Sequence, residues 1–350
     1  MSVAVPTPHL APFTDSIHHP DLWLWDSWVM SDDSTLHLYC LALARRTKSG
    51  EAIAPADFND HPFHYRHFTS SDGGTSWSDR GAVLHPGNLS DKGDSGNVWS
   101  GSVLDVEEGR VLFGYTGIDH AAPDRRFVQT IILASGTPDG PDTFPAAAQS
   151  HPVRDNTAIR EAGYYLPEPG VVGHNDGEGD GTILAWRDPF LFKTPDGTLH
   201  ALWSAKVTER IPAVAHAIVK KEGQHWSLDL QPPIRLPDEH DYTQAEVPKI
   251  CMDDDTGELV LMISACNRLH EAQPDSEVWK QLRLYRSRDI RGPWRVAFRD
   301  TAVIPGTDTL FGASFLDRAV AGGTARVLSP RTAKAEDPMT FAPVLEIPLS

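Results

Sequence analysis

Three acidic side chains stand in short motifs that lie far apart along the chain. The motifs are Trp25-Asp26-Ser27-Trp28, Trp186-Arg187-Asp188-Pro189 and Ala245-Glu246-Val247-Pro248. Cleavage of a glycosidic bond uses two carboxyl groups on opposite sides of that bond, one ionised and one protonated, around an oxocarbenium-like transition state. We therefore interpret Asp26, Asp188 and Glu246 as candidate catalytic residues.

The residues beside these acids suit a sugar pocket. Arg187 can keep the neighbouring Asp188 carboxylate ionised and can donate hydrogen bonds to sugar hydroxyls. The indole rings of Trp25 and Trp99 offer flat apolar faces to the C–H side of a sugar ring. The expected ligand is a small carbohydrate.

The elements that must position these side chains are predominantly β-strands. Short apolar runs alternate with turns rich in Gly, Asp and Pro, and no long amphipathic helix is present. The predicted strands cover residues 36–43, 111–115, 128–133, 199–203, 213–219, 259–264 and 281–285.

A loose internal repeat decides the architecture. In each unit a turn rich in Gly, Pro, Asp or Ser is closed by an aromatic residue and followed by a return strand. The closing aromatic residues are Trp77, Phe144, Trp226, Trp294 and Phe341. Five such units, each long enough for one four-stranded sheet, predict an all-β chain folded as a five-bladed β-propeller.

The propeller gives the distant acids a place to meet. The innermost strand of each blade lines a central channel, so acids at the starts of these strands converge, with Asp26 in unit one, Asp188 in unit three and Glu246 in unit four. The first repeat, at 70–77, matches an Asp-box turn with a structural role. We predict one catalytic domain over residues 1–350, with residues 1–20 as an N-terminal extension.

The motifs together resemble glycoside hydrolase family 68, the levansucrases, inulosucrases and related β-fructofuranosidases. The likeness rests on the three acidic motifs and on Val98-Trp99-Ser100-Gly101-Ser102, in this order. It implies a retaining reaction in which Asp26 is the nucleophile and Glu246 the general acid and base. It also implies that Asp188 stabilises the transition state.

The same resemblance implies a set of substrate contacts. Trp25, Trp99, Ser100 and Arg187 would line the fructosyl subsite. A retaining enzyme holds its two reacting carboxyl groups about 5 to 5.5 Å apart, here those of Asp26 and Glu246.

Two positions depart from the family pattern. Typical members carry an acid two residues before the acid/base and an Arg directly after it, whereas this chain has Gln244 and Val247. Because those family residues contact the leaving sugar, the departures bear on specificity for sucrose more than on cleavage. We expect Gln244 to lie in the substrate site and the donor to be sucrose or a fructooligosaccharide-like β-fructofuranoside. A chain shorter than the usual transferases favours hydrolysis or short transfer products.

Two other interpretations fit the residues. One is an inverting arabinan- or xylan-type glycosidase on the same propeller, whose carboxyl groups would be about 6.5 to 9.5 Å apart. The other is a non-catalytic carbohydrate-binding propeller. Glu246 also has four acidic competitors nearby in the sequence, namely Glu209, Glu239, Asp241 and Glu258.

Charge and hydropathy exclude several partners. The chain has 31 Lys and Arg against 48 Asp and Glu, a net charge of −17, which would repel nucleic acid and anionic lipid. No stretch reaches the roughly 20 apolar residues that span a bilayer. The amino-terminal residues lack a signal-peptide pattern, so we expect a cytoplasmic location. The oligomeric state stays open.

No metal or cofactor is expected. Cys40, Cys251 and Cys266 are too few and too distant for a disulfide framework. The histidines at 61, 64 and 67 would alternate between the two faces of a strand and cannot converge on one ion. The stretch 174–181 has oxygen ligands and glycines that suit calcium, but a solvated hairpin tip is favoured over a site.

Overall fold

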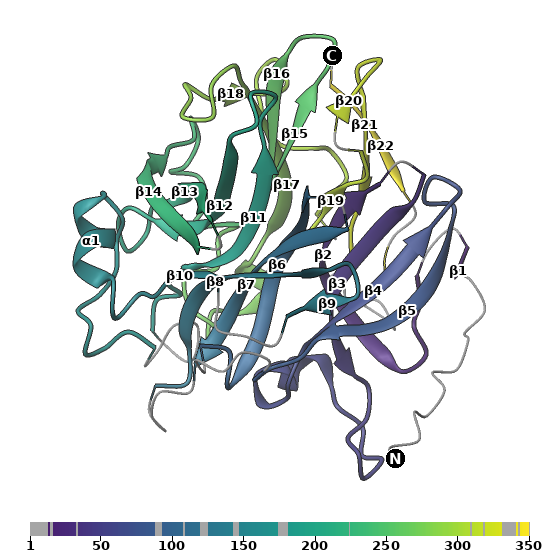
Figure 1. Ribbon diagram of the computed structural model, residues 1–350. Helices are drawn as coiled ribbons and strands as arrows, with labels where there is room; N and C mark the ends of the chain where they lie inside the picture. Colours follow the sequence, from purple (N-terminus) through teal and green to yellow (C-terminus); the bar gives the residue numbers. More distant parts are fainter. Residues whose placement is uncertain are drawn as a thin grey trace.

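The chain forms a five-bladed β-propeller, as the repeat predicts, with 54% of its residues in strands and 4% in helices. The structure is a computed structural model (Figure 1). It describes residues 13–14, 17–32, 34–87, 93–107, 109–119, 125–142, 147–173, 181–223, 225–308, 310–317, 319–330, 341 and 344–349.

The first two blades are antiparallel sheets that follow one another along the chain, each starting at its innermost strand. Blade 1 contains β2 (Leu22–Ser31), β3 (Leu36–Ala44), β4 (His64–Ser70) and β5 (Ser76–Leu84), and β1 (Phe13–Thr14) adds to β5. Blade 2 contains β6 (Asn97–Glu107), β7 (Arg110–Asp119), β8 (Val128–Thr137) and β10 (Ala148–Ser150), with β9 (Gly140–Pro141) paired to β8.

The next three blades complete the ring. Blade 3 contains β11 (Arg187–Lys193), β12 (Leu199–Lys206), β13 (Pro212–Glu222) and β14 (His225–Ile234). Blade 4 contains β15 (Gln244–Asp253), β16 (Glu258–Cys266), β17 (Lys280–Ser287) and β18 (Arg295–Val296), and β20 (Ala319–Val320) runs parallel to β15. Blade 5 contains β19 (Ser314–Phe315), β21 (Thr324–Leu328) and β22 (Leu345–Pro348).

Helices are short and lie in the connections. The α-helix α1 (Asn156–Glu161) follows blade 2, and two 3-10 turns, η1 (Pro55–Asp60) and η2 (Asp275–Glu277), lie within blades 1 and 4. None of the helices in the described ranges is long and apolar enough to cross a membrane.

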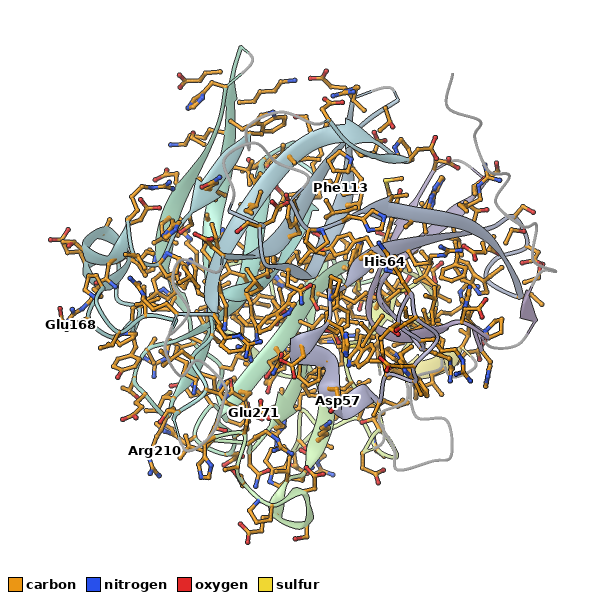
Figure 2. All side chains as sticks on the ribbon, turned by 90° about the horizontal axis from the view of Figure 1, so that it is seen from below. Asp57, His64, Phe113, Glu168, Arg210 and Glu271 are labelled. Atoms are coloured by element: carbon orange, nitrogen blue, oxygen red, sulfur yellow. The ribbon has the colours of Figure 1, made fainter. Side chains whose placement is uncertain are left out.

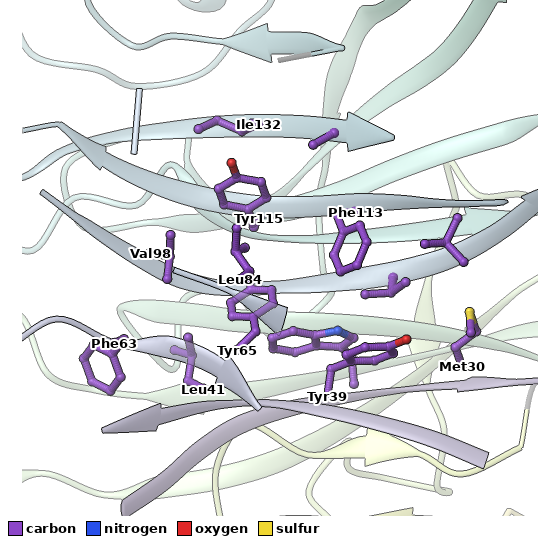
Figure 3. Packing of buried hydrophobic residues seen from close by; sticks show 14 of the residues in the cluster. Met30, Tyr39, Leu41, Phe63, Tyr65, Leu84, Val98, Phe113, Tyr115 and Ile132 are labelled. Carbon is purple, nitrogen blue, oxygen red and sulfur yellow. The ribbon is translucent and has the colours of Figure 1, made fainter. Parts of the chain in front are cut away.

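Each pair of neighbouring blades shares one hydrophobic core, which fixes the propeller geometry. The core between blades 1 and 2 is aromatic. The ring of Tyr39 lies 6.2 Å from that of Phe113, and Tyr65 lies 6.2 Å from Tyr115 (Figure 3). All four side chains are fully buried, so the two sheets pack face to face through close contact of these rings.

The predicted strands are confirmed, and each run extends by a few residues into a longer strand. The repeat is also confirmed where it is described. Trp77 and Trp226 are the second residues of the outer strands β5 and β14, Trp294 directly precedes β18, and all three are buried. Phe144 lies outside the described residues.

The turn at 70–77 has the structural role predicted for it. The Asp72 carboxylate accepts hydrogen bonds from the Ser76 amide at 2.9 Å and from the Ser70 hydroxyl at 2.7 Å. These bonds close the connection between β4 and β5 at the outer edge of blade 1 and place the Trp77 ring against the core that blade 1 shares with blade 5.

The ring closes where blade 5 meets blade 1. The Phe341 amide donates to the Ile17 carbonyl at 3.0 Å, and the Ser314 hydroxyl donates to the Ser27 carbonyl at 2.5 Å. Within the first 20 residues, β1 thus pairs with β5 of blade 1, and Ile17 pairs with Phe341 beside blade 5.

Candidate active site

The innermost strands of blades 1 to 4 share one irregularity, a β-bulge at the level of the site residues. In each strand the pairing with the second strand of the blade shifts register there. The shifts lie between Leu24 and Ser27, Trp99 and Gly101, Arg187 and Phe190, and Glu246 and Lys249. Because a bulge re-aims the side chains within it, these four bulges turn residues of four blades toward one place.

Two of the bulges contain strained backbone. Asp188 has a φ of 64° and Val247 a φ of 49°, the two described non-glycine residues with positive φ, and each directly precedes a proline. Such conformations cost about 1 to 3 kcal/mol each. The strain brings the Val247 amide to the Asp188 carboxylate, N to Oδ2, at 3.4 Å. The backbone geometry thus links the acidic motif of blade 3 to that of blade 4.

Asp188 is fixed from several sides. Its amide donates to the Thr116 hydroxyl at 2.8 Å, and its Oδ2 accepts from the Ser204 hydroxyl at 2.9 Å. The Thr116 hydroxyl in turn donates to the Ser100 carbonyl at 3.1 Å. Asp188 therefore has little freedom to move, and its side chain is only 4% exposed.

The sequence predicted Asp26 at the start of a strand, and this prediction is wrong. Asp26 lies within β2, which already begins at Leu22. The Ser100 hydroxyl donates a short hydrogen bond to Asp26 Oδ2. On the other side the backbone of Gly312 packs so closely that a Cβ there would lie 1.9 Å from Asp26 Oδ1. The carboxylate is thus held between blade 2 and the entry to blade 5.

Arg187 joins the acids of blades 3 and 4. Its Nη2 donates to Glu246 Oε1 at 3.0 Å, its Nε lies 3.7 Å from Asp188 Oδ2, and its Nη1 donates to the Leu184 carbonyl at 2.6 Å. The guanidinium is 90% buried, so its bonds to the two carboxylates are shielded from water. The Glu246 side chain is the more open of the two acids, at 18% exposure.

The acids that compete with Glu246 in the sequence have other partners. Glu239 forms an ion pair with Arg235, and Glu258 forms one with Arg295 at 2.6 Å. Glu246 contacts the arginine of the blade 3 motif instead, which distinguishes it among these acids.

Burial governs the protonation of the site. It raises the pKa of Asp188 to about 7, and the charges of Glu246 and Asp26 act in the same direction. Arg187 lowers this pKa, as expected from the sequence, but does not outweigh burial. Burial also raises the pKa of Asp26, against the hydrogen bond from Ser100. The free protein therefore retains a proton among these carboxyl groups near neutral pH.

This protonation predicts how stability depends on pH. Because the fold favours the protonated form of Asp188, its stabilising contribution is complete below about pH 4 and is lost as pH rises through about 7. Across this range we expect the free energy of unfolding of the wild type to fall relative to that of Asp188→Asn. Urea denaturation of both proteins between pH 4 and pH 8 measures the difference. Parallel curves would contradict the raised pKa.

The two predicted sugar platforms lie at the edge of one core. Trp25 and Trp99 are both partly exposed and pack against the core between blades 1 and 2. The Trp25 ring is perpendicular to Phe63 at 5.0 Å, and the Trp99 ring lies 6.2 Å from Phe127. Their position on β2 and β6 places them beside Asp26 and Ser100 respectively.

Gln244 has a different environment from the other predicted residues. It is 1% exposed, and its Nε2 donates to the carbonyls of Arg268 at 3.1 Å and Ile183 at 3.5 Å. These bonds connect the loops before β11 and after β16. Gln244 therefore holds these two loops together.

The loop after β16 brings a further acid to the site, Glu271. Its side chain is 42% exposed and lies 3.8 Å from Arg268 Nη1. Burial and the charge of Glu246 raise the pKa of Glu271, against the effect of Arg268. Seen from below the view of Figure 1, Glu271 lies nearer the middle of the molecule than Arg210 (Figure 2). Glu271 is thus close enough to Glu246 for the two charges to act on one another.

Several site residues carried no sequence motif. Thr116, Ser204 and Lys249 look like ordinary strand residues, and Gly312 looks like a turn glycine. Thr116 lies on β7 and Ser204 on β12, the second strands of their blades, and Gly312 precedes β19. Lys249 lies on the innermost strand of blade 4, so the repeat was a signal for this residue only.

Metal ligands do not cluster among the residues that the structure describes. Among the described residues no group of three or more His, Cys, Asp or Glu side chains could hold an ion. Cys40, Cys251 and Cys266 are free thiols and buried. The calcium alternative considered at 174–181 lies outside the described residues except for Gly181.

No protein-family model matches the chain, and no curated protein sequence matches it. Solved structures of five-bladed propellers do. A levansucrase complexed with sucrose is 12% identical, with a TM-score of 0.60 over 95% of this chain and 85% of the other. Bacillus subtilis levansucrase gives the same values.

A Bacillus megaterium levansucrase variant is 14% identical, with a TM-score of 0.61 over 94% of this chain and 83% of the other. At these identities the similarity shows a shared fold. It agrees with the fold expected from the resemblance to glycoside hydrolase family 68.

Proposed function

We propose that this protein is a retaining glycosidase or transglycosidase that acts on β-fructofuranosides. The observation that carries the proposal is the convergence of acids from blades 1, 3 and 4. Arg187 contacts both Asp188 and Glu246, and Asp26 is close enough to both for their charges to act on one another. Convergence of this kind supports a role that one isolated carboxylate would not.

The proposed reaction has two displacement steps. In the first, an Asp26 carboxylate oxygen attacks the anomeric carbon while Glu246 gives its proton to the leaving oxygen, so the glycosidic bond breaks and a fructosyl ester forms. In the second, Glu246 takes a proton from water or an acceptor sugar, whose oxygen attacks the same carbon and releases Asp26. Asp188 accepts hydrogen bonds from ring hydroxyls throughout.

The surroundings of each acid support its proposed role. Asp26 is held in place by Ser100 and by close packing against Gly312, as a nucleophile that must meet one carbon requires. Glu246 is more exposed than Asp188, which suits a group that exchanges protons with the leaving group and with water. The half-exposed rings of Trp25 and Trp99 suit the apolar face of the sugar.

A small carbohydrate is the proposed ligand. Levansucrase structures that share this fold hold sucrose in one case and oligosaccharides in another. The leaving-group side differs here, because Gln244 is turned toward backbone carbonyls and Glu271 reaches the acids from another loop. We therefore propose a β-fructofuranoside donor without committing to sucrose.

The assay that tests the function compares three substrates and follows the products by chromatography and NMR. The substrates are sucrose, a short fructooligosaccharide and 4-nitrophenyl α-L-arabinofuranoside. We expect release or transfer of fructose with retained β configuration at the first turnover. Arabinose released with inversion would assign the chain to the inverting class, and binding without turnover would make it a carbohydrate-binding propeller.

A further inference from the structure

A buried lysine beside the acids has no role in the reaction as described so far. Lys249 lies on β15, directly after the bulge that begins at Glu246. It is 1% exposed, and within the described part of the chain its Nζ has no hydrogen-bond partner. The ammonium lies 5.3 Å from the centre of the Phe190 ring, on the strand that carries Asp188.

Such a placement is costly unless the charge is used. Removing an ammonium group from water without a hydrogen-bond acceptor is unfavourable by several kcal/mol. A methionine would fill the same space without that cost. The cation–π contact with the Phe190 ring recovers only part of that cost. A structural role alone therefore does not explain a lysine at this position.

The charges that act on the ammonium identify its partners. Burial lowers the pKa of Lys249 to about 8, and the carboxylates of Asp26 and Asp188 oppose this. Lys249 is therefore mostly charged at neutral pH. Asp188 has its own cation in Arg187 at 3.7 Å, whereas Asp26 accepts its hydrogen bond from the neutral Ser100 hydroxyl.

Of the two cations that act on Asp26, Lys249 has the stronger effect on its pKa and Arg187 the weaker. Asp26 is thus the carboxylate that depends on Lys249 for a positive charge.

We propose that Lys249 is a positioning residue whose buried positive charge keeps Asp26 ionised for attack, without contact between the ammonium and the sugar. Only the attack by Asp26 on the sugar rests on the proposed function. The electrostatic link between Lys249 and Asp26 is tested independently of the proposed function. In this cluster Arg187 acts on all three carboxyl groups, and Lys249 adds a buried positive charge that acts on Asp26 and Asp188.

A double-mutant cycle tests this link without any substrate. The proteins are wild type, Lys249→Met, Asp26→Asn and the double variant, each unfolded in urea at pH 7, where Lys249 is mostly charged. We expect the unfolding equilibrium constant of the double variant to differ from the product of the single effects by about tenfold or more. The deviation should shrink as the pH falls, because burial raises the pKa of Asp26 and its carboxylate takes up a proton.

The chain provides a matched control for the cycle in Lys206. This second lysine is also 1% exposed, but its ammonium donates to the Glu209 carbonyl at 3.0 Å. Lys206→Met should be additive with Asp26→Asn within about twofold. Additive effects for Lys249 as well would overturn the proposal. If Lys249→Met does not fold, Lys249→Gln removes the same charge with a polar side chain.

The pH profile of kcat/KM is the second readout. Asp26 is faced by Glu246 and Lys249 from β15, Arg187 and Asp188 from β11, and the buried Tyr65 hydroxyl from β4. Lys249→Met removes only one of these charges, so the acid limb should move to higher pH. The loss of activity should be about tenfold greater at pH 5 than at pH 8.

The charge-preserving variant Lys249→Arg should return the acid limb toward the wild-type pH. An unmoved limb in Lys249→Met, together with additive stabilities, would overturn the role of Lys249. A non-additive cycle in a protein that turns over no furanoside would retain the Lys249–Asp26 link and reject the proposed function.

Discussion

Asp26→Asn is expected to lower kcat/KM on a β-fructofuranoside by about 10,000-fold or more, in the range found when a catalytic nucleophile is removed. The amide keeps the shape of the carboxylate but cannot form the fructosyl ester. It can still accept the hydrogen bond from Ser100, so the pocket should stay intact. Steady-state kinetics with the best donor from the substrate comparison measures the loss.

The matched control is Asp105→Asn. Asp105 is an exposed carboxylate on β6, the same strand that carries Ser100. It should leave both kcat/KM and the melting temperature unchanged. If Asp26→Asn retained more than about a tenth of the wild-type activity while Asp105→Asn was normal, Asp26 would not be the nucleophile.

Substitution of Glu246 distinguishes the two chemical steps of the proposed reaction. Glu246→Ala should slow turnover of a donor with a poor leaving group by about 100 to 10,000-fold, the usual contribution of a general acid and base. With 4-nitrophenyl β-D-fructofuranoside the first step needs no proton, so the fructosyl ester should accumulate. Added azide should then restore turnover and yield the β-fructosyl azide, which a double displacement explains and a single displacement does not.

The parts of the site that the sequence predicted are those with unusual local composition. Asp26 lies between tryptophans, and Asp188 and Glu246 stand beside prolines that are uncommon inside strands. Such residues are conspicuous because an ordinary strand would not contain them. Pro189 and Pro248 directly follow the two positive-φ residues, Asp188 and Val247. The unusual composition and the bulged backbone therefore occur at the same positions.

The contacts between blades were not predictable in the same way. Gly312 meets Asp26 only because the ring closes between blade 5 and blade 1, and no local pattern around residue 312 records that closure. In the sequence Lys249 resembles the charged residues that strands carry on exposed faces, but it is buried and directly follows the bulge that begins at Glu246. The strand position of Asp26 was wrong for a related reason, since a bulge interrupts the alternation that marks a strand start.

Gly312→Ala should lower kcat/KM by about 100-fold or more, although residue 312 carries no chemical group. The new methyl group would lie 1.9 Å from Asp26 Oδ1 and 2.9 Å from the Asp26 Cα. These contacts are too short to persist, and rotation of the carboxylate alone cannot relieve the second one. The nucleophile must therefore shift, and a displacement of about 1 Å from the reactive geometry costs on the order of 100-fold in rate.

The backbone of Gly312 resists any compensating movement. Its carbonyl accepts from the Ser27 amide at 3.2 Å, and its amide donates to the Ser264 hydroxyl at 2.9 Å. Ser264 pairs with Glu246 across β15 and β16. A shift of residue 312 away from Asp26 would thus disturb Ser264 and, through it, Glu246. Activity should fall whether Asp26 or Glu246 is displaced.

Gly306→Ala separates this clash from the cost of the backbone conformation. Gly306 has a φ of 75°, close to the 68° of Gly312, but a Cβ there would meet nothing within 4 Å. Both variants should lose about 1 to 2 kcal/mol of stability from the left-handed conformation, measurable by urea denaturation. Only Gly312→Ala should also lose activity. Equal activity in the two variants would show that contact with the Gly312 backbone does not position the Asp26 carboxylate.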